Sequence, residues 1–152
     1  MKQFLTAVVL VGFGAVSAAA AGPDISKRQA QGTVPEVMDA LVAAVDGAGA
    51  TVFARIDHAK GAQDAGMTLA PNQVLVFGNP VLGTPAIQDD ALAGLYLPLK
   101  VLVYEDAKGQ VWLAYENPAE TLGDMQGIGD DAGYIGKMQG ALDKLTSDAA
   151  GG

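Results

Sequence analysis

The sequence contains one histidine, His58, which follows Asp57 at the end of a partly alternating segment. Imidazole is the side chain whose ordinary pKa lies near neutrality, so His58 is the candidate for a general base or a ligand contact. Neighbouring residues on a strand point to opposite faces, however, so adjacency alone does not aim Asp57 at His58. His58 therefore has two interpretations: a functional base, or a turn residue that hydrogen-bonds the backbone.

A second group of candidate residues lies between Asn79 and Lys100. Gly83-Thr84-Pro85 is a turn signal whose backbone N–H groups can face an anion, although the glycine pattern and lysine of a phosphate loop are absent. Lys100 opens an apolar run, where its ammonium group either pairs with an acid or holds an anionic ligand. We expect a ligand-binding site made of His58, Asn79, Gly83, Thr84 and Lys100.

The residue types exclude several kinds of chemistry. The chain has no cysteine, which removes thiol catalysis, thiolate metal sites and iron–sulfur clusters. The pairs Asp89-Asp90 and Asp130-Asp131 lack the spacing of a calcium loop and are expected to cap helices. No serine stands where a Ser-His-Asp arrangement needs one. The sequence therefore favours binding without catalysis, cofactor or metal, and leaves open a hydrolase- or isomerase-like enzyme with His58 as its general base.

The chain is acidic, with 17 Asp and Glu against 9 Lys and Arg and a formal net charge of −8. Nucleic-acid phosphates and anionic lipid surfaces repel such a chain, and no compact basic patch offsets this repulsion. We therefore expect no nucleic-acid partner.

The first residues have the order of a secretory signal peptide. Lys2 precedes the apolar run Phe4–Val16, and the small residues Ser17–Ala21 follow. The run is shorter than the ~20 residues of a membrane-spanning helix, and no basic cluster stops its transfer. Cleavage would bring the net charge to about −9 and release the protein into the periplasm without a stable membrane anchor. We expect residues 1–21 to be a cleaved signal peptide, residues 22–147 one domain, and residues 148–152 a disordered tail.

Hydrophobic periodicity predicts a helix and then two strands in the first half of the chain. Thr33 and Glu36 have the spacing of a capping box, and apolar residues recur at helical intervals from Val34 to Val45. Thr51–Asp57 alternates partly, which is typical of a strand. Gln73–Phe77 shows no alternation, which indicates a strand covered on both faces.

The second half predicts a hairpin between helical segments. Val81–Leu99 is rich in glycine and proline and predicts a loop with short helical pieces. Lys100–Tyr104 and Gln110–Tyr115 are joined by a short turn, so these two strands are antiparallel. A last helix is predicted at about Ala132–Leu145. Helices before and after a run of antiparallel strands predict an α+β sandwich.

Several motifs occur in order along the chain: Phe77-Gly78-Asn79-Pro80, Gly83-Thr84-Pro85, the run Leu97–Asp106, and Tyr115–Ala119, with Ile56–Ala59, Gly66 and Leu69 upstream. Together they resemble the family of domain of unknown function 302 (DUF302), over about Val34 to Leu145. The resemblance implies a TATA-binding-protein-like fold, with a curved antiparallel sheet packed on two helices, and a homodimer. It implies no agreed activity. The chain departs from the family's usual pattern at Ala86-Ile87 and in Gly123–Gly136.

The combined expectation is an exported α+β homodimer that binds a small molecule or a protein partner without catalysis. Its pocket or dimer seam is expected along the Gly78–Thr84 loop, beside His58 and Lys100.

Overall fold

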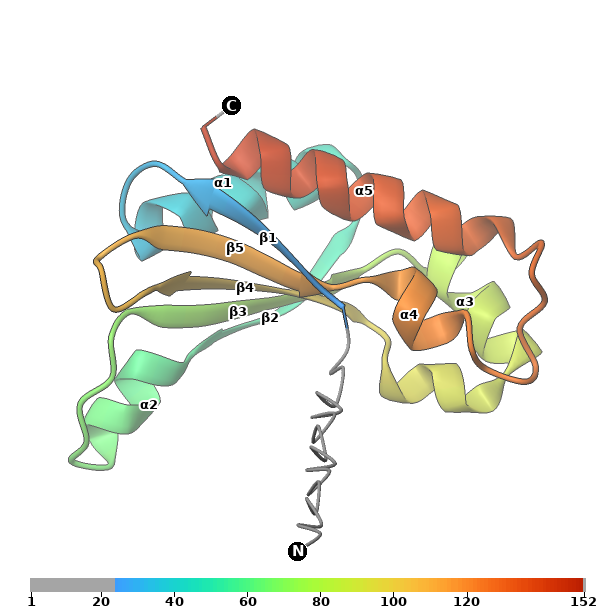
Figure 1. The fold of residues 1–152 in the computed structure, drawn as a ribbon, viewed down its shortest axis with the longest axis horizontal. Helices are drawn as coiled ribbons and strands as arrows, with labels where there is room; N and C mark the ends of the chain where they lie inside the picture. Colours follow the sequence, from blue (N-terminus) through green and yellow to red (C-terminus); the bar gives the residue numbers. More distant parts are fainter. Residues whose placement is uncertain (1–23, 152) are drawn as a thin grey trace, which may run out of the picture.

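The computed structural model describes residues 24–151, so the expected signal peptide, residues 1–21, lies outside the described residues. Within this range one antiparallel sheet has the strand order β1-β5-β4-β3-β2. Figure 1 shows helices α1 and α5 lying together over one side of this sheet. The elements are β1 (Ile25–Ala30), α1 (Val34–Gly47), β2 (Thr51–Asp57), α2 (His58–Asp64), β3 (Asn72–Gly78), α3 (Pro80–Asp89), the 3-10 helix η1 (Ala91–Leu95), β4 (Leu99–Glu105), β5 (Val111–Glu116), α4 (Pro118–Leu122) and α5 (Gly133–Ala149).

The α+β class and the antiparallel sheet packed on helices are confirmed. Helix α1 begins as the capping-box spacing predicts, because the backbone N–H of Thr33 donates to the Glu36 carboxylate at 2.8 Å. The hydrogen bond from the Thr33 backbone holds the pKa of the Glu36 carboxyl below its ordinary value. The apolar stripe of α1 packs with that of α5 on one face of the sheet, and this forms the main core.

The core lies on one face of the sheet only. Along β3, Leu75 and Phe77 are buried against the helices, whereas Val74 and Val76 are half-buried on the other face. The expectation that both faces of this strand are covered is therefore wrong. Val74 and Val76 are shielded by neighbouring side chains of β2 and β4, which explains why the strand sequence does not alternate.

The expected loop of Val81–Leu99 is more regular than its composition indicates. It contains α3 and η1, which pack with Leu122, Ile128 and Met138 in a second, smaller apolar cluster. Asn79 and Asp90 provide the N-caps of the two helices, accepting hydrogen bonds from Val81 N and Leu92 N. Turn-forming residues thus begin short helices in this segment.

The C-terminal end of the chain is ordered further than expected. Helix α5 continues to Ala149, and both Ala149 and Ala150 are buried in the main core. The N–H of Gln31 also donates to Ala150 O at 3.2 Å. The expectation of a disordered tail from residue 148 is therefore wrong for the residues up to 151, because small apolar residues at the end of α5 pack on β1. None of the helices in residues 24–151 is long and apolar enough to cross a membrane.

Candidate functional site

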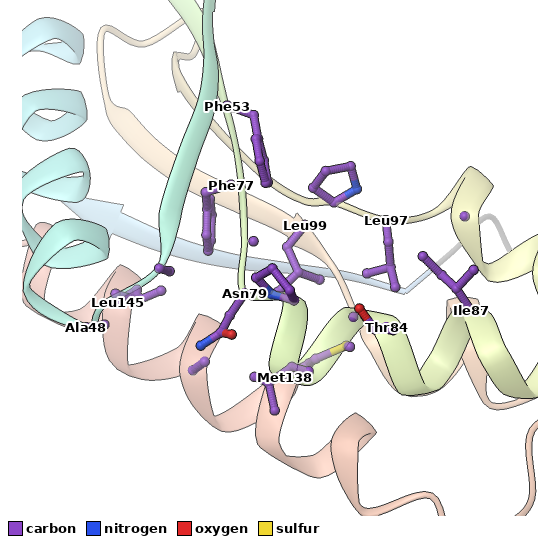
Figure 2. Close-up of a pocket in the computed structure, with 18 residues that line it drawn as sticks. Ala48, Phe53, Phe77, Asn79, Thr84, Ile87, Leu97, Leu99, Met138 and Leu145 are labelled. Carbon is purple, nitrogen blue, oxygen red and sulfur yellow. The ribbon is translucent and has the colours of Figure 1, made fainter.

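A cavity of about 320 Å3 lies at the end of the sheet where β3 turns into α3 (Figure 2). Its walls come from the β3–α3 turn, the approach to β4, one side of α5, and the start of β2. The residues that line it are Ala48, Ala50, Phe53, Phe77, Gly78, Asn79, Pro80, Leu82, Gly83, Thr84, Ile87, Gly94, Leu97, Pro98, Leu99, Met138, Ala141 and Leu145.

Asn79 fixes the turn between β3 and α3, which forms part of the cavity wall. Its side-chain oxygen accepts a hydrogen bond from Val81 N at 2.9 Å, and its carbonyl accepts from the N–H groups of Leu82 and Gly83. Pro80 then occupies the first helical position, where its missing N–H is tolerated. Because the cap uses the side-chain oxygen, the amide nitrogen of Asn79 is a donor without a protein partner in residues 24–151.

The wall on the other side of β3 depends on a bulge in β2. The register between β2 and β3 shifts at Val52/Ala54, and Phe53 is the extra residue. Its ring is 56% exposed and lines the cavity together with the buried ring of Phe77 (Figure 2). A bulge at this edge therefore aims an aromatic side chain at the site.

The lining is almost entirely apolar. Among its side chains only Asn79 and Thr84 carry polar atoms, and neither is charged. The Thr84 hydroxyl has no hydrogen-bond partner within the described part of the chain, so it is a second group that a ligand could contact. An unpaired charge is costly to bury, whereas an apolar body with one or two polar atoms fits this lining.

Three of the five expected site residues meet here: Asn79, Gly83 and Thr84 all line the cavity. Lys100 does not. It lies on the face of β4 that points away from α1 and α5, 3.8 Å from Glu116 Oε2 on the neighbouring strand. The alternation of side chains along β4 turns Lys100 away from the cavity, because Leu99 and Val101 on either side of Lys100 face the core.

His58 is also remote from this cavity. It is the exposed first residue of α2, at the end of β2 opposite to the end that pairs with Gly78. Six residues of strand separate the two ends, which corresponds to roughly 20 Å. Asp57 does not orient it: one carboxylate oxygen accepts from Lys60 N at 2.9 Å and the other from the Gln73 amide at 3.0 Å. The structure therefore places His58 away from the cavity and does not pair it with the Asp57 carboxylate.

Contacts between distant segments hold the cavity walls together. Tyr134 at the start of α5 donates to Asp89 at the end of α3, with 2.8 Å between the Tyr134 oxygen and Asp89 Oδ2. Desolvation, together with this hydrogen bond and the Asp89 charge, raises the pKa of Tyr134 to about 12. At Gly127 a β-carbon would lie 2.3 Å from the carbonyl oxygen of Asp89, so a glycine is required there. The glycine-rich segment thus allows a close approach to α3.

Sequence reasoning missed most of the apolar walls. Met138, Ala141 and Leu145 are spaced along one side of α5 at i, i+3 and i+7, a periodicity that indicates a core face and does not distinguish a cavity wall. The partial alternation of Thr51–Asp57 does not reveal the bulge in β2 that aims Phe53 at the cavity. Only the turn motif carried a recognisable signal. In residues 24–151 no group of three or more His, Asp or Glu side chains is arranged to hold a metal ion.

Comparison with known proteins assigns a family but no activity. The family model described as "Domain of unknown function DUF302" matches residues 25–145. A crystal structure of an uncharacterized conserved DUF302 protein from Bacillus stearothermophilus superposes with a TM-score of 0.74. The alignment covers 82% of this chain and 97% of that one, at 17% sequence identity, and shows a shared fold.

The curated relatives match only part of this chain. Fluoride-specific ion channel FluC 1 of Brucella suis and FluC 1 of Brucella abortus are each 41% identical to it over 87 residues. The matched stretch is 57% of this chain, and 34% and 32% of the two relatives. The matched stretch is thus about a third of the length of these relatives.

Proposed function

We propose that this chain, which belongs to the DUF302 family, is a binding module rather than an enzyme and that its ligand is a small, uncharged, mainly apolar molecule. The single observation that carries this proposal is the composition of the cavity at the β3–α3 turn. Its volume of about 320 Å3 is at the lower end of the range of ~300–1,000 Å3 that is typical of ligand pockets.

The polar atoms of the cavity limit the chemistry of the ligand. The amide nitrogen of Asn79 supplies N–H donors whose orientation is set by the cap on Val81. The complementary ligand group is a hydrogen-bond acceptor, such as a carbonyl or an ether oxygen. The Thr84 hydroxyl can donate or accept beside it. No charged side chain lines the cavity, so a carboxylate or an ammonium group would be buried there without a counter-ion.

Catalysis with His58 as general base has no support in this geometry. A general base must lie within hydrogen-bond reach of the proton that it abstracts, directly or through one water molecule. His58 is roughly 20 Å from the cavity end of β2 and does not line the cavity. The hydrolase- or isomerase-like alternative is therefore not part of the proposal.

The proposal includes two further points: the compartment in which the protein acts, and its relation to the fluoride channels. The signal-peptide pattern of residues 1–21 supports export to the periplasm. The relatives are named as fluoride channels, but this chain matches only a third of their length, so we infer a shared accessory binding domain. Fluoride itself is a poor match for this cavity, because no cationic side chain lines it.

Native mass spectrometry of the protein purified from its own envelope fraction tests the proposal. We expect a reproducible additional mass of an uncharged molecule. Titration with Nile red, an uncharged apolar dye with a carbonyl acceptor, provides a second readout. Sodium fluoride is expected neither to bind nor to compete with the dye.

Two variants and a control locate the binding. Asn79→Asp keeps an N-cap oxygen for α3 but removes the N–H donors and adds a charge, so it should abolish binding while the fold remains. Ala141→Leu fills the cavity from α5, and Ala43→Leu on the exposed side of α1 is its matched control. Dye binding that survives both cavity variants, or is lost equally in Ala43→Leu, would rule out this site.

A further inference from the structure

A groove of about 440 Å3 is lined by residues of β1, β4 and β5. Its floor is Ala114 of β5, which pairs with Lys27 of β1 on one side and with Leu102 of β4 on the other. Leu113 and Val103 beside them face the main core, so strand alternation places the groove on the face of the sheet away from α1 and α5 (Figure 1). Residues paired on one face stand side by side, so the single methyl group of Ala114 leaves a hollow between two longer side chains.

This groove is separate from the cavity at the β3–α3 turn. The two share no lining residue. Leu99 lines the cavity from the helix side of β4, whereas Lys100, the next residue, lines the groove from the other side. Binding in the groove therefore does not depend on binding in the cavity.

The groove carries more positive than negative charge, unlike the molecule as a whole. Lys27 and Lys100 line it with a single acid, Glu116, whereas the chain has a formal net charge of −8. Within residues 24–151 Lys27 forms no ion pair, and the Lys100 ammonium is 3.8 Å from Glu116 Oε2, which is too long for a hydrogen bond. Both ammonium groups therefore retain N–H donors for an added acceptor.

The two lysines stand on either side of Ala114. Their strands, β1 and β4, are separated by β5, and Lys100 lies two residues before the row that contains Lys27. Two strand spacings and two residues along the strand put their Cα atoms roughly 12 Å apart. The lysine stem is long and flexible, so both ammonium groups can reach one anion held above Ala114.

The rest of the lining suits an apolar group. Leu102 and Ile25 contribute aliphatic side chains, and the ring of Tyr104 lies at the end of the groove that is nearer to Trp112, with which Tyr104 pairs. A lysine on an edge strand such as β1 also discourages pairing with other chains. That role does not explain Lys100, because β4 is the central strand of the sheet. A lysine beside exposed apolar side chains on a central strand is better explained by a ligand that carries a negative charge.

We propose that this groove is a second ligand site, which binds a monocarboxylate with an apolar body. The carboxylate lies between the Lys27 and Lys100 ammonium groups, and the apolar body lies over Ala114 and Leu102. A second negative charge on the ligand would meet Glu116, so a dicarboxylate fits less well. The groove therefore selects a charged amphiphile, whereas the lining of the cavity suits an uncharged molecule.

Titration with dansylglycine, an apolar fluorophore with one carboxylate, tests the proposal. Trp112 is the only tryptophan and pairs with Tyr104 of the groove, so energy transfer from Trp112 to the dansyl group reports binding there. Dansylamide has the same fluorophore without the carboxylate, and we expect it to bind at least about fivefold more weakly. An excess of Nile red should not displace dansylglycine, because the two sites share no residue.

Variants of the lining should change the affinity for dansylglycine in both directions. Lys27→Gln and Lys100→Gln should each weaken binding by about threefold, because each removes one exposed charge partner. Glu116→Gln removes the nearby negative charge and should strengthen binding by a similar factor, which a loss of folding could not produce. Ala114→Leu fills the hollow and should abolish energy transfer from Trp112. Lys137→Gln removes an exposed lysine of α5, on the other side of the sheet, and is the matched control that should bind normally.

Several results would overturn the proposal. Equal affinities for dansylglycine and dansylamide would mean that the carboxylate is not recognised. The same loss in Lys137→Gln as in Lys27→Gln would reduce the effect to net charge, and displacement by Nile red would place the ligand in the cavity. A Trp112 emission that changes with protein concentration in the absence of ligand would mean that another copy covers the groove. Circular dichroism spectra equal to that of the unchanged protein establish that each variant is folded.

Discussion

The ring of Phe53 lies over Gly78, so closely that a β-carbon on Gly78 would be 3.3 Å from Cε2 of the ring. Phe53 is the bulge residue of β2, and Gly78 is the last residue of β3 before the Asn79 turn. The absence of a side chain at Gly78 thus lets an edge strand contribute an aromatic wall to the cavity. Pro98 approaches the same position, with its Cβ 3.5 Å away.

Gly78→Ala should therefore affect binding more than stability. The Phe53 ring is largely exposed and can move by a few tenths of an ångström, so the unfolding free energy should change by less than about 1 kcal/mol. The displaced ring alters the cavity wall, and Nile red affinity should fall by about tenfold. Urea unfolding and dye titration measure the two effects. An unchanged affinity would mean that the Phe53 ring is not a wall of the binding site.

Two glycines near α5 should respond oppositely to alanine. Gly140 lies inside α5 with open space around its β position, so Gly140→Ala should stabilise the fold by about 1 kcal/mol. Gly127→Ala would place a β-carbon 2.3 Å from Asp89 O and should destabilise it by at least about 2 kcal/mol. Thermal unfolding of both variants measures the difference. Equal effects would contradict the proposed role of Gly127 in the close approach to α3.

The loop of the β4–β5 hairpin should lose stability in acid. The backbone N–H of Gln110, then that of Lys108 and the Trp112 indole, donate to Asp106 and hold the pKa of its carboxyl below the ordinary value. A lowered pKa stabilises the fold above about pH 4, and this contribution is lost as the pH falls through the lowered value. In Asp106→Asn, the unfolding free energy should therefore fall less steeply as the pH is lowered; this acidic part of the stability curve is its acid limb.

Urea unfolding followed by Trp112 fluorescence between about pH 2 and pH 5 measures this effect. Asp46→Asn, at an exposed position near the end of α1, is the control for the loss of one negative charge. An acid limb that is equally steep in Asp106→Asn and in the unchanged protein would contradict the assignment.

The phenol of Tyr134 should ionise at a higher pH than an ordinary tyrosine. Its pKa of about 12 lies above the ordinary value of 10.0, because desolvation and the neighbouring Asp89 disfavour the phenolate. The raised pKa stabilises the fold below about pH 10, and this contribution is lost as the pH rises through about 12. Absorbance titration should show a late phase that is absent from Tyr134→Phe. A titration in which Tyr134→Phe removes an ordinary phase near pH 10 would contradict this environment.

His58→Ala should have little effect on stability or on dye binding. The side chain is exposed on α2 and does not line the cavity, so stability should change by less than about 0.5 kcal/mol and dye affinity should stay the same. Asn79→Asp, measured in parallel, should lose the dye. A loss of binding in His58→Ala similar to that in Asn79→Asp would restore His58 as a site residue.

Local signals predicted the α+β class, the first helix, the hairpin and the turn that opens the cavity. Thr33 with Glu36 is a capping box, and Asn79-Pro80 begins a helix, since both depend on residues close in sequence. The sequence of Gln73–Phe77 predicts a strand covered on both faces, because apolar residues on the face away from the helices look the same in sequence as buried ones. The sequence predicts disorder at Ala149 and Ala150, because their burial depends on β1, more than a hundred residues away.

The sequence by itself determined the acidic charge, the absence of thiol chemistry and the turn at Asn79, because these follow from composition and near neighbours. The turn predicted at Gly83-Thr84-Pro85 is wrong, because these residues lie within α3. Tertiary structure decided which candidate residues meet. Strand direction placed His58 and Asn79 at opposite ends of the sheet, and strand alternation turned Lys100 away from the cavity toward Glu116. Pairing between β2 and β3 also created the bulge that brings Phe53 over Gly78. A cavity depends on contacts between segments far apart in the chain, and spacing along the sequence does not contain them.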